Sequence, residues 1–539
     1  MRREWLPRVA YFCMEFGLHE SFPIYAGGLG VLAGDLMKAA CDAKVPLVGF
    51  GLLWSEGYTD QRIGADGRPY DQPNPVPRHF LEPVEPRISL KIRGKDVEIR
   101  AWKTNRFGSA DLYLLEPVHE EDRWITRRLY QGGKADRIAQ ELLLGVGGVR
   151  MLRALGLYVD VYHFNEGHAS FAGLELMREQ MALGLNLDAA RHAVRDKIVF
   201  TTHTPVPAGN EEHPIHMMNE QGVDLGVFHS DQLARVAGDP FGMTPCGLRL
   251  ARVANGVARL HAETARKMWS HVHDAAPILS ITNGVHRGTW QAGEIVDALF
   301  RGGDLWTAHQ QQKSALLELI QERTGAELRS DRLLIGFARR AATYKRATML
   351  FEDLVEIEPL LIEGKVQAVF AGKAHPADHG GKDLIAKLVE MTKKYPNRVV
   401  FLESYDIGLG AAMTRGCDVW LNNPRRPMEA SGTSGMKAAM NGCLNLSTLD
   451  GWWAEGCSHG VNGWQFGDAK EGEGADEHDR RALYHVLKQG VLPTYYEHRE
   501  RWVQMMTDSI LMSQERFSAQ RMLEDYYELM YRKPAQLDV

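Results

Sequence analysis

The sequence has few cysteines, and none of them stands in a metal-binding or redox spacing. No two cysteines are separated by only two residues; the six are Cys13, Cys41, Cys246, Cys417, Cys443 and Cys457. Zinc ribbons and thioredoxin-like motifs need such pairs, and small disulfide scaffolds need a higher density of cysteine. We therefore expect no metal site and no disulfide framework, and a reducing compartment fits the composition.

Long hydrophobic runs and an excess of basic charge are also lacking. No stretch approaches the length of a membrane-spanning helix. The N-terminus, Met1-Arg-Arg-Glu-Trp-Leu-Pro, has no apolar run behind its charges and does not resemble a signal peptide. The formal net charge of −6 gives nucleic acid no broad basic surface to bind. These absences predict a cytoplasmic protein that binds neither membranes nor nucleic acids.

The pattern that is present is an alternation of apolar strands and helices. The chain of 539 residues exceeds what one hydrophobic core usually serves, so we expect two large domains. In the first half, an apolar strand at 9–12 precedes a glycine loop, a helix at 31–44 and a second strand at 45–53. In the second half, the predicted strands lie at 333–337, 366–370, 398–402, 419–421 and 444–447. Apolar strands separated by helices are typical of parallel sheets covered on both faces.

The predicted fold class is α/β, with two doubly wound, Rossmann-like domains facing each other across a cleft. The segments 88–93 and 97–102 alternate with period two around Gly94-Lys95-Asp96, which predicts a β-hairpin insertion in the first domain. We expect an N-terminal domain over 1–295, a C-terminal domain over 296–505 and a C-terminal helix over 506–539 that could pack back on the first domain. Ligands of such sheets bind at the carboxyl ends of the strands.

The run Pro427-Met-Glu-Ala-Ser-Gly-Thr-Ser-Gly-Met-Lys437 is the most informative segment. Its glycines allow a sharp turn and a close approach to a ligand, and the start of the following helix favours an anion. Lys437 could neutralise a phosphate, or form a Schiff base with an aldehyde cofactor. An ordinary loop-to-helix junction with a solvent-facing lysine explains the segment equally well, because Gly-rich turns are common.

A second candidate is the basic turn Gly336-Phe-Ala-Arg-Arg340-Ala-Ala-Thr-Tyr-Lys345-Arg346, which directly follows a predicted strand. Four cations at a strand end could surround a phosphate, which needs fixed positive partners once it leaves water. A solvated basic turn is the alternative. The glycine loop Gly27-Gly28-Leu29-Gly30 also precedes a helix, but such a short loop alone favours tight-turn packing over anion binding.

Histidine and asparagine occur in turns that follow strands of the first domain. The three turns are Phe164-Asn-Glu-Gly-His168, Thr201-Thr-His203 and Ile281-Thr-Asn283. Neutral imidazole and amide groups suit sugar hydroxyls because each offers a donor and an acceptor. One such histidine is more often structural, yet the repetition at one sheet edge favours a binding site. Asn255 opens a predicted helix, either as its N-cap or as a hydroxyl ligand.

Taken together, these segments resemble the α-glucan phosphorylases, the family of glycogen, starch and maltodextrin phosphorylases. The similarity spans residues 9 to 470 and is strongest from Glu429 to Lys437. It is also carried by Gly27-Gly-Leu-Gly, Asn255-Gly-Val-Ala-Arg-Leu-His261, Thr282-Asn-Gly-Val, Tyr344-Lys-Arg, Phe401-Leu-Glu-Ser-Tyr405, Met440-Asn-Gly and Leu446-Ser-Thr-Leu-Asp-Gly451. Ala338-Arg-Arg and Gly451-Trp-Trp resemble the shorter bacterial and archaeal branch.

The resemblance implies reversible phosphorolysis of the non-reducing-end glucose of an α-1,4-glucan or maltooligosaccharide by inorganic phosphate. The product would be glucose 1-phosphate with retained configuration, and the phosphate of pyridoxal 5′-phosphate would assist catalysis. A cytoplasmic homodimer is implied by the family alone.

The family's residue roles carry over to matching positions. Lys437 would hold pyridoxal phosphate as a Schiff base. Its 5′-phosphate would be bound by Arg339, Tyr405, Thr433 and Ser434, whereas Arg340, Lys345 and the backbone at Gly28 would bind inorganic phosphate beside it. The glucosyl unit would be held by His203, Asn255, Glu429, Ser431 and Gly432. The expected catalytic residues are Lys437, Arg340, Lys345, His203 and Glu429.

Two other functions remain open at this stage. A nucleotide-sugar-dependent glucan synthase would share the two-domain (GT-B) architecture, but such enzymes often carry a second glutamate eight positions after the first, where this chain has Lys437. A noncatalytic glucan-binding relative would be expected to lose Lys437 or the cations Arg340 and Lys345. Asp406 departs from the basic residue common in relatives. Because 9–12 is already a strand, we expect no regulatory N-terminal extension.

Overall fold

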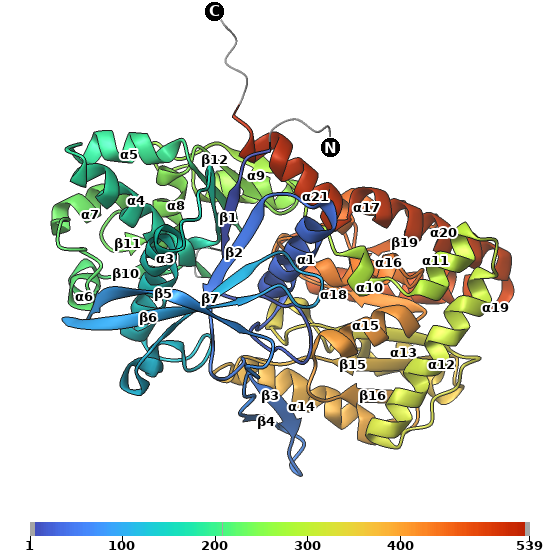
Figure 1. The fold of residues 1–539 in the computed structure, drawn as a ribbon. Coiled ribbons are helices and arrows are strands. Elements are labelled where there is room, and N and C mark those ends of the chain that lie inside the picture. The colour runs from blue at the N-terminus through green and yellow to red at the C-terminus, as the bar shows by residue number, and fades with distance from the viewer. Residues whose placement is uncertain (1–5, 207–208, 534–539) are drawn as a thin grey trace, which may run out of the picture. The chain divides into compact units, whose positions relative to one another are not determined.

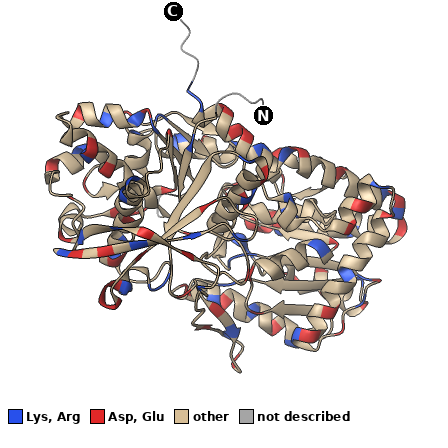
Figure 2. Ribbon diagram, viewed as in Figure 1, with Lys and Arg blue, Asp and Glu red and all other residues tan. Residues whose placement is uncertain are grey.

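The computed structural model describes residues 6–206 and 209–533, and the chain divides into two compact units. Unit 1 comprises 1–58, 74–282 and 520–539, and unit 2 comprises 59–73 and 283–519. Among the described residues, no helix is long and apolar enough to cross a membrane. Figure 2 shows basic and acidic residues interspersed along the helices of both units.

Unit 1 is built on a nine-stranded sheet with the order β13-β12-β9-β8-β1-β2-β7-β6-β5. The pairs from β13 to β7 are parallel. The strands of this parallel part are β1 (Val9–Phe12), β2 (Leu47–Leu52), β7 (Leu112–Pro117), β8 (Val161–Asn165), β9 (Ile198–Thr202), β12 (Val253–Gly256) and β13 (Ile278–Ser280). Helix α1 (Gly28–Ala43) connects β1 to β2. Parallel strands need such crossovers, which is why apolar strands alternate with helices in the sequence.

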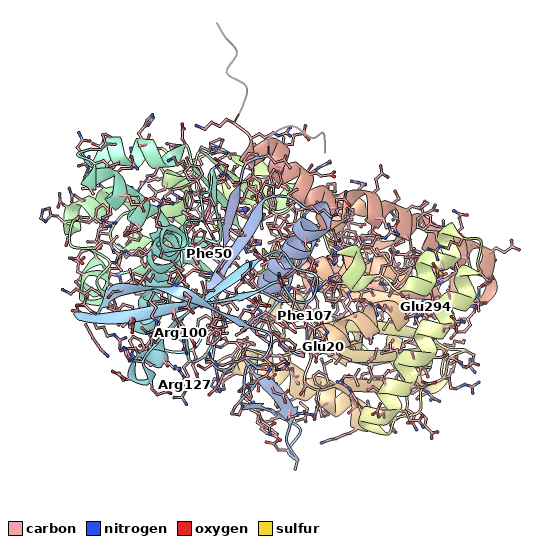
Figure 3. The ribbon with its side chains drawn as sticks, viewed as in Figure 1. Glu20, Phe50, Arg100, Phe107, Arg127 and Glu294 are labelled. Atoms are coloured by element: carbon pink, nitrogen blue, oxygen red, sulfur yellow. The ribbon has the colours of Figure 1, made fainter. Side chains whose placement is uncertain are left out.

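The predicted hairpin insertion is present as β5 (Glu82–Ile92) and β6 (Lys95–Thr104). The two strands pair antiparallel with each other and extend the parallel sheet beyond β7, forming the long ribbon in Figure 1. Arg100 on β6 and Phe50 on β2 are labelled in Figure 3. Phe50 is fully buried and stacks on Phe12 of β1 with ring centroids 5.4 Å apart, so the apolar strands meet in the core as expected.

Unit 2 contains a six-stranded, all-parallel sheet with the order β16-β15-β14-β17-β18-β19. Its strands are β14 (Leu333–Ala338), β15 (Val366–Ala371), β16 (Val399–Leu402), β17 (Val419–Asn422), β18 (Leu444–Thr448) and β19 (Gly463–Phe466). Every residue of β14 and β15 is buried, as a strand covered on both faces requires. The α/β class with two main, largely parallel sheets is thus confirmed.

Helices make up the last part of the chain, from α18 (Ala475–Val486) through α19 (Leu492–Glu497), α20 (Arg499–Arg516) and α21 (Ala519–Asp525) to a final helical turn, η8 (Tyr526–Tyr531). Residues from 520 onward belong to unit 1.

One excursion of the chain was not predicted. The short strands β3 (Asp60–Ile63) and β4 (Pro69–Gln72) pair with each other and belong to unit 2, although the sequence on both sides belongs to unit 1. The side chain of Gln61 exchanges hydrogen bonds with the backbone of Ala374, and Asp71 binds Lys382 at 2.6 Å. A short polar ribbon held by contacts more than 300 residues away gives no periodic signal in the sequence.

Candidate active site

In unit 2, two cationic side chains and one carboxylate meet at the carboxyl end of β14. Arg339 directly follows the strand, Lys345 ends a short 3₁₀ turn (Thr343–Lys345), and Glu429 comes from the loop after β17. The carboxylate of Glu429 accepts hydrogen bonds from Arg339 Nη2 at 2.5 Å and from Lys345 Nζ at 2.8 Å. Burial alone would raise the pKa of Glu429, but the two cations lower it to about 2. Glu429 is therefore a firmly ionised partner of both cations.

The other two cations of the basic turn are placed differently. Arg346 is 4% exposed and binds Asp479 at 2.7 Å and Asp476 at 2.9 Å. Both aspartates lie on α18, so Arg346 holds this helix in place. The prediction that all four cations surround a phosphate is therefore wrong for Arg346. Arg340 is exposed. The proposal that it binds phosphate stays a prediction.

Asp450 fixes the backbone beside Glu429. Its Oδ2 accepts the Glu429 N–H at 2.9 Å, and its Oδ1 accepts the Gly451 N–H at 2.9 Å. Burial, helped by the charge of Glu429 and opposed by these two hydrogen bonds, raises the pKa of Asp450 to about 7. Asp450 thus holds a proton over much of the pH range in which Glu429 is ionised.

The loop between Glu429 and helix α16 (Thr433–Ala439) has the close approach expected of its glycines. Gly432 has a φ of +83°, and a Cβ there would lie 3.2 Å from Cγ of Glu429 and 3.4 Å from Nη2 of Arg339. Thr433 and Ser434 begin α16 and are half-buried; Ser434 Oγ accepts a hydrogen bond from Trp420 at 3.1 Å. The buried Ser431 Oγ has no hydrogen-bond partner within the part of the chain that the structure describes.

Lys437 lies in the last turn of α16 and is only 7% exposed, so the alternative of a solvent-facing lysine is wrong. Its Nζ lies 3.7 Å from the ring centroid of Trp290, a cation–π contact. The fully buried amide of Asn441 donates to the carbonyls of both Lys437, at 2.9 Å, and Trp290, at 3.0 Å. This amide therefore holds the lysine and the indole together.

Tyr405 and Asp406 follow β16. Burial raises the pKa of Tyr405, so its phenol is a neutral hydrogen-bonding group, and Arg339 is close enough to counteract part of that rise. Asp406 is the N-cap of helix α15 (Ile407–Gly416) and accepts the Leu409 N–H at 2.7 Å. The unusual acidic residue at 406 thus has a structural explanation.

These residues fit a cofactor that carries an aldehyde and a phosphate. A buried lysine offers an amine for the aldehyde, and Arg339 Nη1 and Ser431 Oγ are buried polar atoms without a hydrogen-bond partner in the described residues. Unsatisfied buried donors cost about 1–3 kcal/mol each, which a bound phosphate or sugar would recover. Both atoms belong to residues predicted to bind a ligand.

In unit 1, Glu15 organises the glycine loop. Its Oε2 accepts the N–H groups of Ala26 at 2.6 Å and Gly27 at 3.2 Å, and its Oε1 accepts the phenol of Tyr130 at 2.7 Å. A Cβ on Gly30 would lie only 2.5 Å from Oε2 of Glu15, so this position requires glycine. Gly28, the first residue of α1, is exposed and has open space beside it, as an anion-binding helix start would need.

His203 lies just beyond β9 among polar groups from β8. Its ring Nε2 lies 2.5 Å from Asn165 Oδ1, and its backbone N–H donates to the Glu166 carboxylate at 2.8 Å. Burial lowers the pKa of His203 to about 3, so the imidazole is neutral, as expected for a group that recognises hydroxyls. Glu166 has a φ of +75° and is 7% exposed, a combination that gives no sign in the sequence.

Asn255 differs from its prediction. It lies inside β12, so it is not a helix N-cap. Its side chain is fully buried, accepts from Thr201 Oγ1 at 2.6 Å and donates to the Gly256 carbonyl at 3.1 Å. His163 joins the same cluster, 2.7 Å from both Thr201 Oγ1 and the phenol of Tyr531. Each end of the Asn255 amide thus makes a hydrogen bond within this buried cluster, and direct contact with a sugar hydroxyl stays a prediction.

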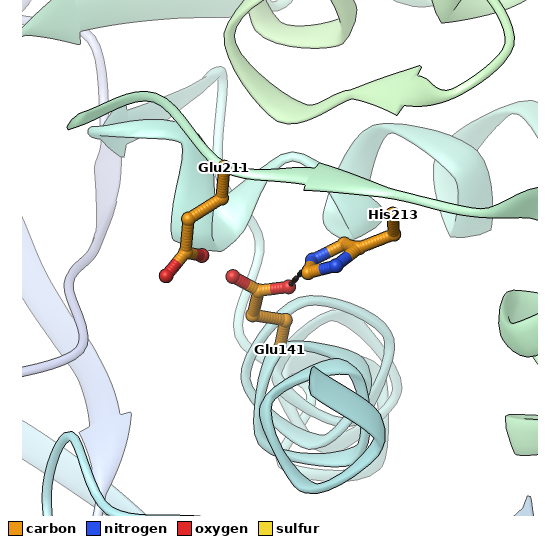
Figure 4. Close-up of side chains that lie close together, drawn as sticks. All are labelled: Glu141, Glu211 and His213. Carbon is orange, nitrogen blue, oxygen red and sulfur yellow. Dashed lines mark hydrogen bonds and ion pairs between the residues drawn. The ribbon is translucent and has the colours of Figure 1, made fainter. Parts of the chain in front are cut away.

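A group of two carboxyls and an imidazole in unit 1 has the composition of a metal site. Glu141, Glu211 and His213 offer ligand atoms within 4.8 Å of one another (Figure 4). Arg137 Nε, however, lies 2.8 Å from Glu211 and 3.6 Å from Glu141. Burial raises the pKa of Glu141 and the charge of Glu211 adds to the rise, so Glu141 is protonated. The guanidinium and this proton already supply the positive charge, and we assign the group to a buried cluster in which His213 lies 2.7 Å from Glu141 and Arg137 pairs with both carboxyls.

The sequence did not point to four residues that shape these sites: Glu15, Trp290, Asn441 and Asp450. Each acts on a residue distant in the sequence, and none stands out by its spacing. Asp450 and Asn441 do lie within segments that resemble the family, which was the only available signal.

The comparisons with known proteins agree with the resemblance. A family model described as "Carbohydrate phosphorylase" matches residues 297–459. Maltodextrin phosphorylase of Thermococcus litoralis is 40% identical, over 98% of this chain and 71% of that protein. Glycogen phosphorylase of Aquifex aeolicus is 36% identical, over 97% of this chain and 86% of that protein. An uncharacterised protein of Methanocaldococcus jannaschii is 34% identical, over 97% of this chain and 99% of its own length.

Proposed function

The chain belongs to the carbohydrate phosphorylase family, and from this premise we propose that it is an α-1,4-glucan phosphorylase. It would transfer the non-reducing-end glucosyl unit of a glycogen or maltodextrin chain to inorganic phosphate, reversibly and with retention. The single observation that best supports this proposal is the buried Lys437 beside Trp290, next to a loop whose neighbours include Arg339, Lys345 and Glu429.

Pyridoxal phosphate, when bound, would supply a phosphate group that exchanges a proton with the substrate phosphate. In this proposal Lys437 anchors the cofactor, and Arg339, Tyr405, Thr433 and Ser434 bind its phosphate. A dianion at this position gains from the fixed guanidinium and from the half-buried hydroxyls at the start of α16.

The remaining residues would bind the substrates. Arg340, Lys345 and the backbone at Gly28 would bind inorganic phosphate, and the positive charge of the two side chains would offset the repulsion between two phosphates. The neutral imidazole of His203 and the groups of Glu429, Ser431 and Gly432 would orient the glucosyl unit through its hydroxyls. Holding both reactants in place is itself a large part of such catalysis.

The nucleotide-sugar glucan synthase is the second candidate, since it would share the architecture. A carboxylate suits the ribose diol of a nucleotide, whereas position 437 carries a buried lysine, which suits an aldehyde or a phosphate. Consumption of UDP-glucose or ADP-glucose by a protein without the cofactor's absorbance would favour the synthase.

The test is to incubate the purified protein with a maltooligosaccharide and inorganic phosphate and to assay glucose 1-phosphate. We expect product formation, together with the near-ultraviolet absorbance of a covalently held pyridoxal phosphate. Lys437→Ala should lose both. The control variant Lys488→Ala removes a lysine that pairs with Glu356 and is not part of the proposed site. It should keep both the product formation and the absorbance. Absence of the absorbance from an active wild-type protein would contradict the proposal.

The finer organisation remains predicted. The proposal includes the domain boundaries at 295 and 505, two domains that face each other across a cleft, a homodimer and a cytoplasmic location.

A further inference from the structure

The two buried cations of the candidate site, Arg339 and Lys345, already bind a carboxylate of the same chain, that of Glu429. Glu429 Oε2 lies 2.5 Å from Arg339 Nη2 and 2.8 Å from Lys345 Nζ, and Oε1 lies 3.1 Å from the same lysine nitrogen. All three side chains are largely buried, with exposed fractions of 5%, 11% and 10% for Arg339, Lys345 and Glu429. The carboxylate thus holds a desolvated, charge-assisted position of the kind that phosphate oxygens favour.

A phosphate group and this carboxylate cannot use the same donors at once. Their oxygens would lie side by side in a site with little water to screen them, and like charges at that separation repel strongly. Protonation does not relieve the conflict, because the two cations hold the pKa of Glu429 at about 2, against the effect of burial. The carboxylate must therefore leave these nitrogens when a phosphate takes them.

The surroundings let the side chain move while the backbone stays. Asp450 accepts the Glu429 backbone N–H at 2.9 Å and so fixes the backbone from which the side chain extends. Gly432, which has no side chain, borders Cγ of Glu429 and leaves space for the glutamate side chain to move. Among the described residues, the buried Arg339 Nη1 has no hydrogen-bond partner, so an oxyanion that takes Nη2 from the carboxylate gains a second donor on the same guanidinium.

We propose that Glu429 is a built-in competitor at the Arg339–Lys345 pair, and that a phosphate group binds there by displacing its carboxylate. The released carboxylate then becomes available to sugar hydroxyls, which couples anion binding to recognition of the glucosyl unit. The inference rests on the proposed function only for the source of the phosphate, which is either inorganic phosphate or the cofactor.

The experiment uses calorimetry on the full chain to measure equilibrium binding of inorganic phosphate to the protein as purified and, in a separate arm, of pyridoxal phosphate to the full chain freed of bound cofactor. Glu429→Gln removes the competing charge and keeps the size of the side chain. We expect it to bind phosphate about tenfold more tightly than the wild type, as loss of one like charge in a poorly screened site implies. The matched control is Glu116→Gln, which makes the same charge change at a fully buried glutamate bound by Arg78 and Arg100. It should leave both affinities unchanged.

The two arms separate the sources. A gain for inorganic phosphate assigns the pair to the substrate, and a gain for pyridoxal phosphate assigns it to the cofactor. Unchanged or weaker binding of both ligands by Glu429→Gln overturns the proposal. If that variant does not fold, Glu429→Asp, whose carboxylate is withdrawn by one methylene, should show a smaller gain, and no gain there overturns the proposal equally.

Failure of this inference is distinct from failure of the proposed function. An active phosphorylase in which Glu429→Gln gains no affinity would refute the competition alone. A protein that shows the gain but makes no glucose 1-phosphate would refute the activity alone.

Discussion

Replacing Asp450 with asparagine should make the protein less stable in acid and more stable in alkali. The carboxyl is 3% exposed, and burial raises its pKa from an ordinary 3.8 to about 7. Below pH 4 the side chain is protonated in both the folded and the unfolded chain, so its ionisation contributes nothing. Between pH 4 and 7 the unfolded chain loses the proton first, and the wild-type protein becomes less stable as the pH rises.

The magnitude follows from the two pKa values. At about 1.4 kcal/mol for each pH unit between them, ionisation of Asp450 costs up to about 4 kcal/mol of folding free energy by pH 8. Asparagine avoids this cost, but its single carbonyl can accept only one of the two N–H groups of Glu429 and Gly451. That loss costs about 1 kcal/mol at every pH. The variant should thus melt lower than the wild type at pH 4 and higher at pH 8.

The assay is calorimetric melting of both proteins at intervals between pH 4 and 8. A net change of about 3 kcal/mol at pH 8 corresponds to a rise in Tm of roughly 6 °C for a unit of this size. The decisive feature is the crossing of the two curves. A difference in Tm that keeps one sign and one size over the whole range would refute the view that Asp450 is a buried acid with a raised pKa.

Two further changes test unit 1. Tyr531→Phe should lower the Tm, because His163 Nδ1 loses its 2.7 Å partner and a buried unsatisfied group costs about 1–3 kcal/mol; an unchanged Tm would mean that the phenol contributes little. Gly30→Ala places a methyl 2.5 Å from the Glu15 carboxylate and should displace the glycine loop. We expect a higher KM for phosphate in the phosphorolysis assay with little change in KM for the glucan, and equal changes in both would show that the loop is not specific to phosphate.

The sequence predicted the main elements of the fold because each depends on local patterns. Buried strands such as β14 are continuous apolar runs, β15 is apolar except for Gln367, and the β5–β6 hairpin alternates with period two around a turn. The small ribbon at 59–73 was missed because its place in unit 2 is decided by partners such as Ala374 and Lys382, which no local pattern indicates.

The candidate site was predictable as a set of segments but not as a set of contacts. Lys437, Arg339 and Lys345 were identified from motifs. That Glu429 would bind both cations could not be inferred, because it depends on how the loop after β17 turns toward the end of β14. Asn255 shows the opposite case: its motif matches the family, while its burial and its bonds to Thr201 and Gly256 appear only in three dimensions.

The way in which the chain alternates between its two units limits how the gene could be divided. Each unit is completed by a distant piece of sequence, residues 520–539 for the first and 59–73 for the second. A fragment ended near residue 295 would leave His163 without Tyr531 and would carry away the ribbon that Ala374 and Lys382 bind. Neither half, expressed as one continuous segment, would then contain all the residues of its unit. A protein divided in this way would need the missing segment added as a separate chain.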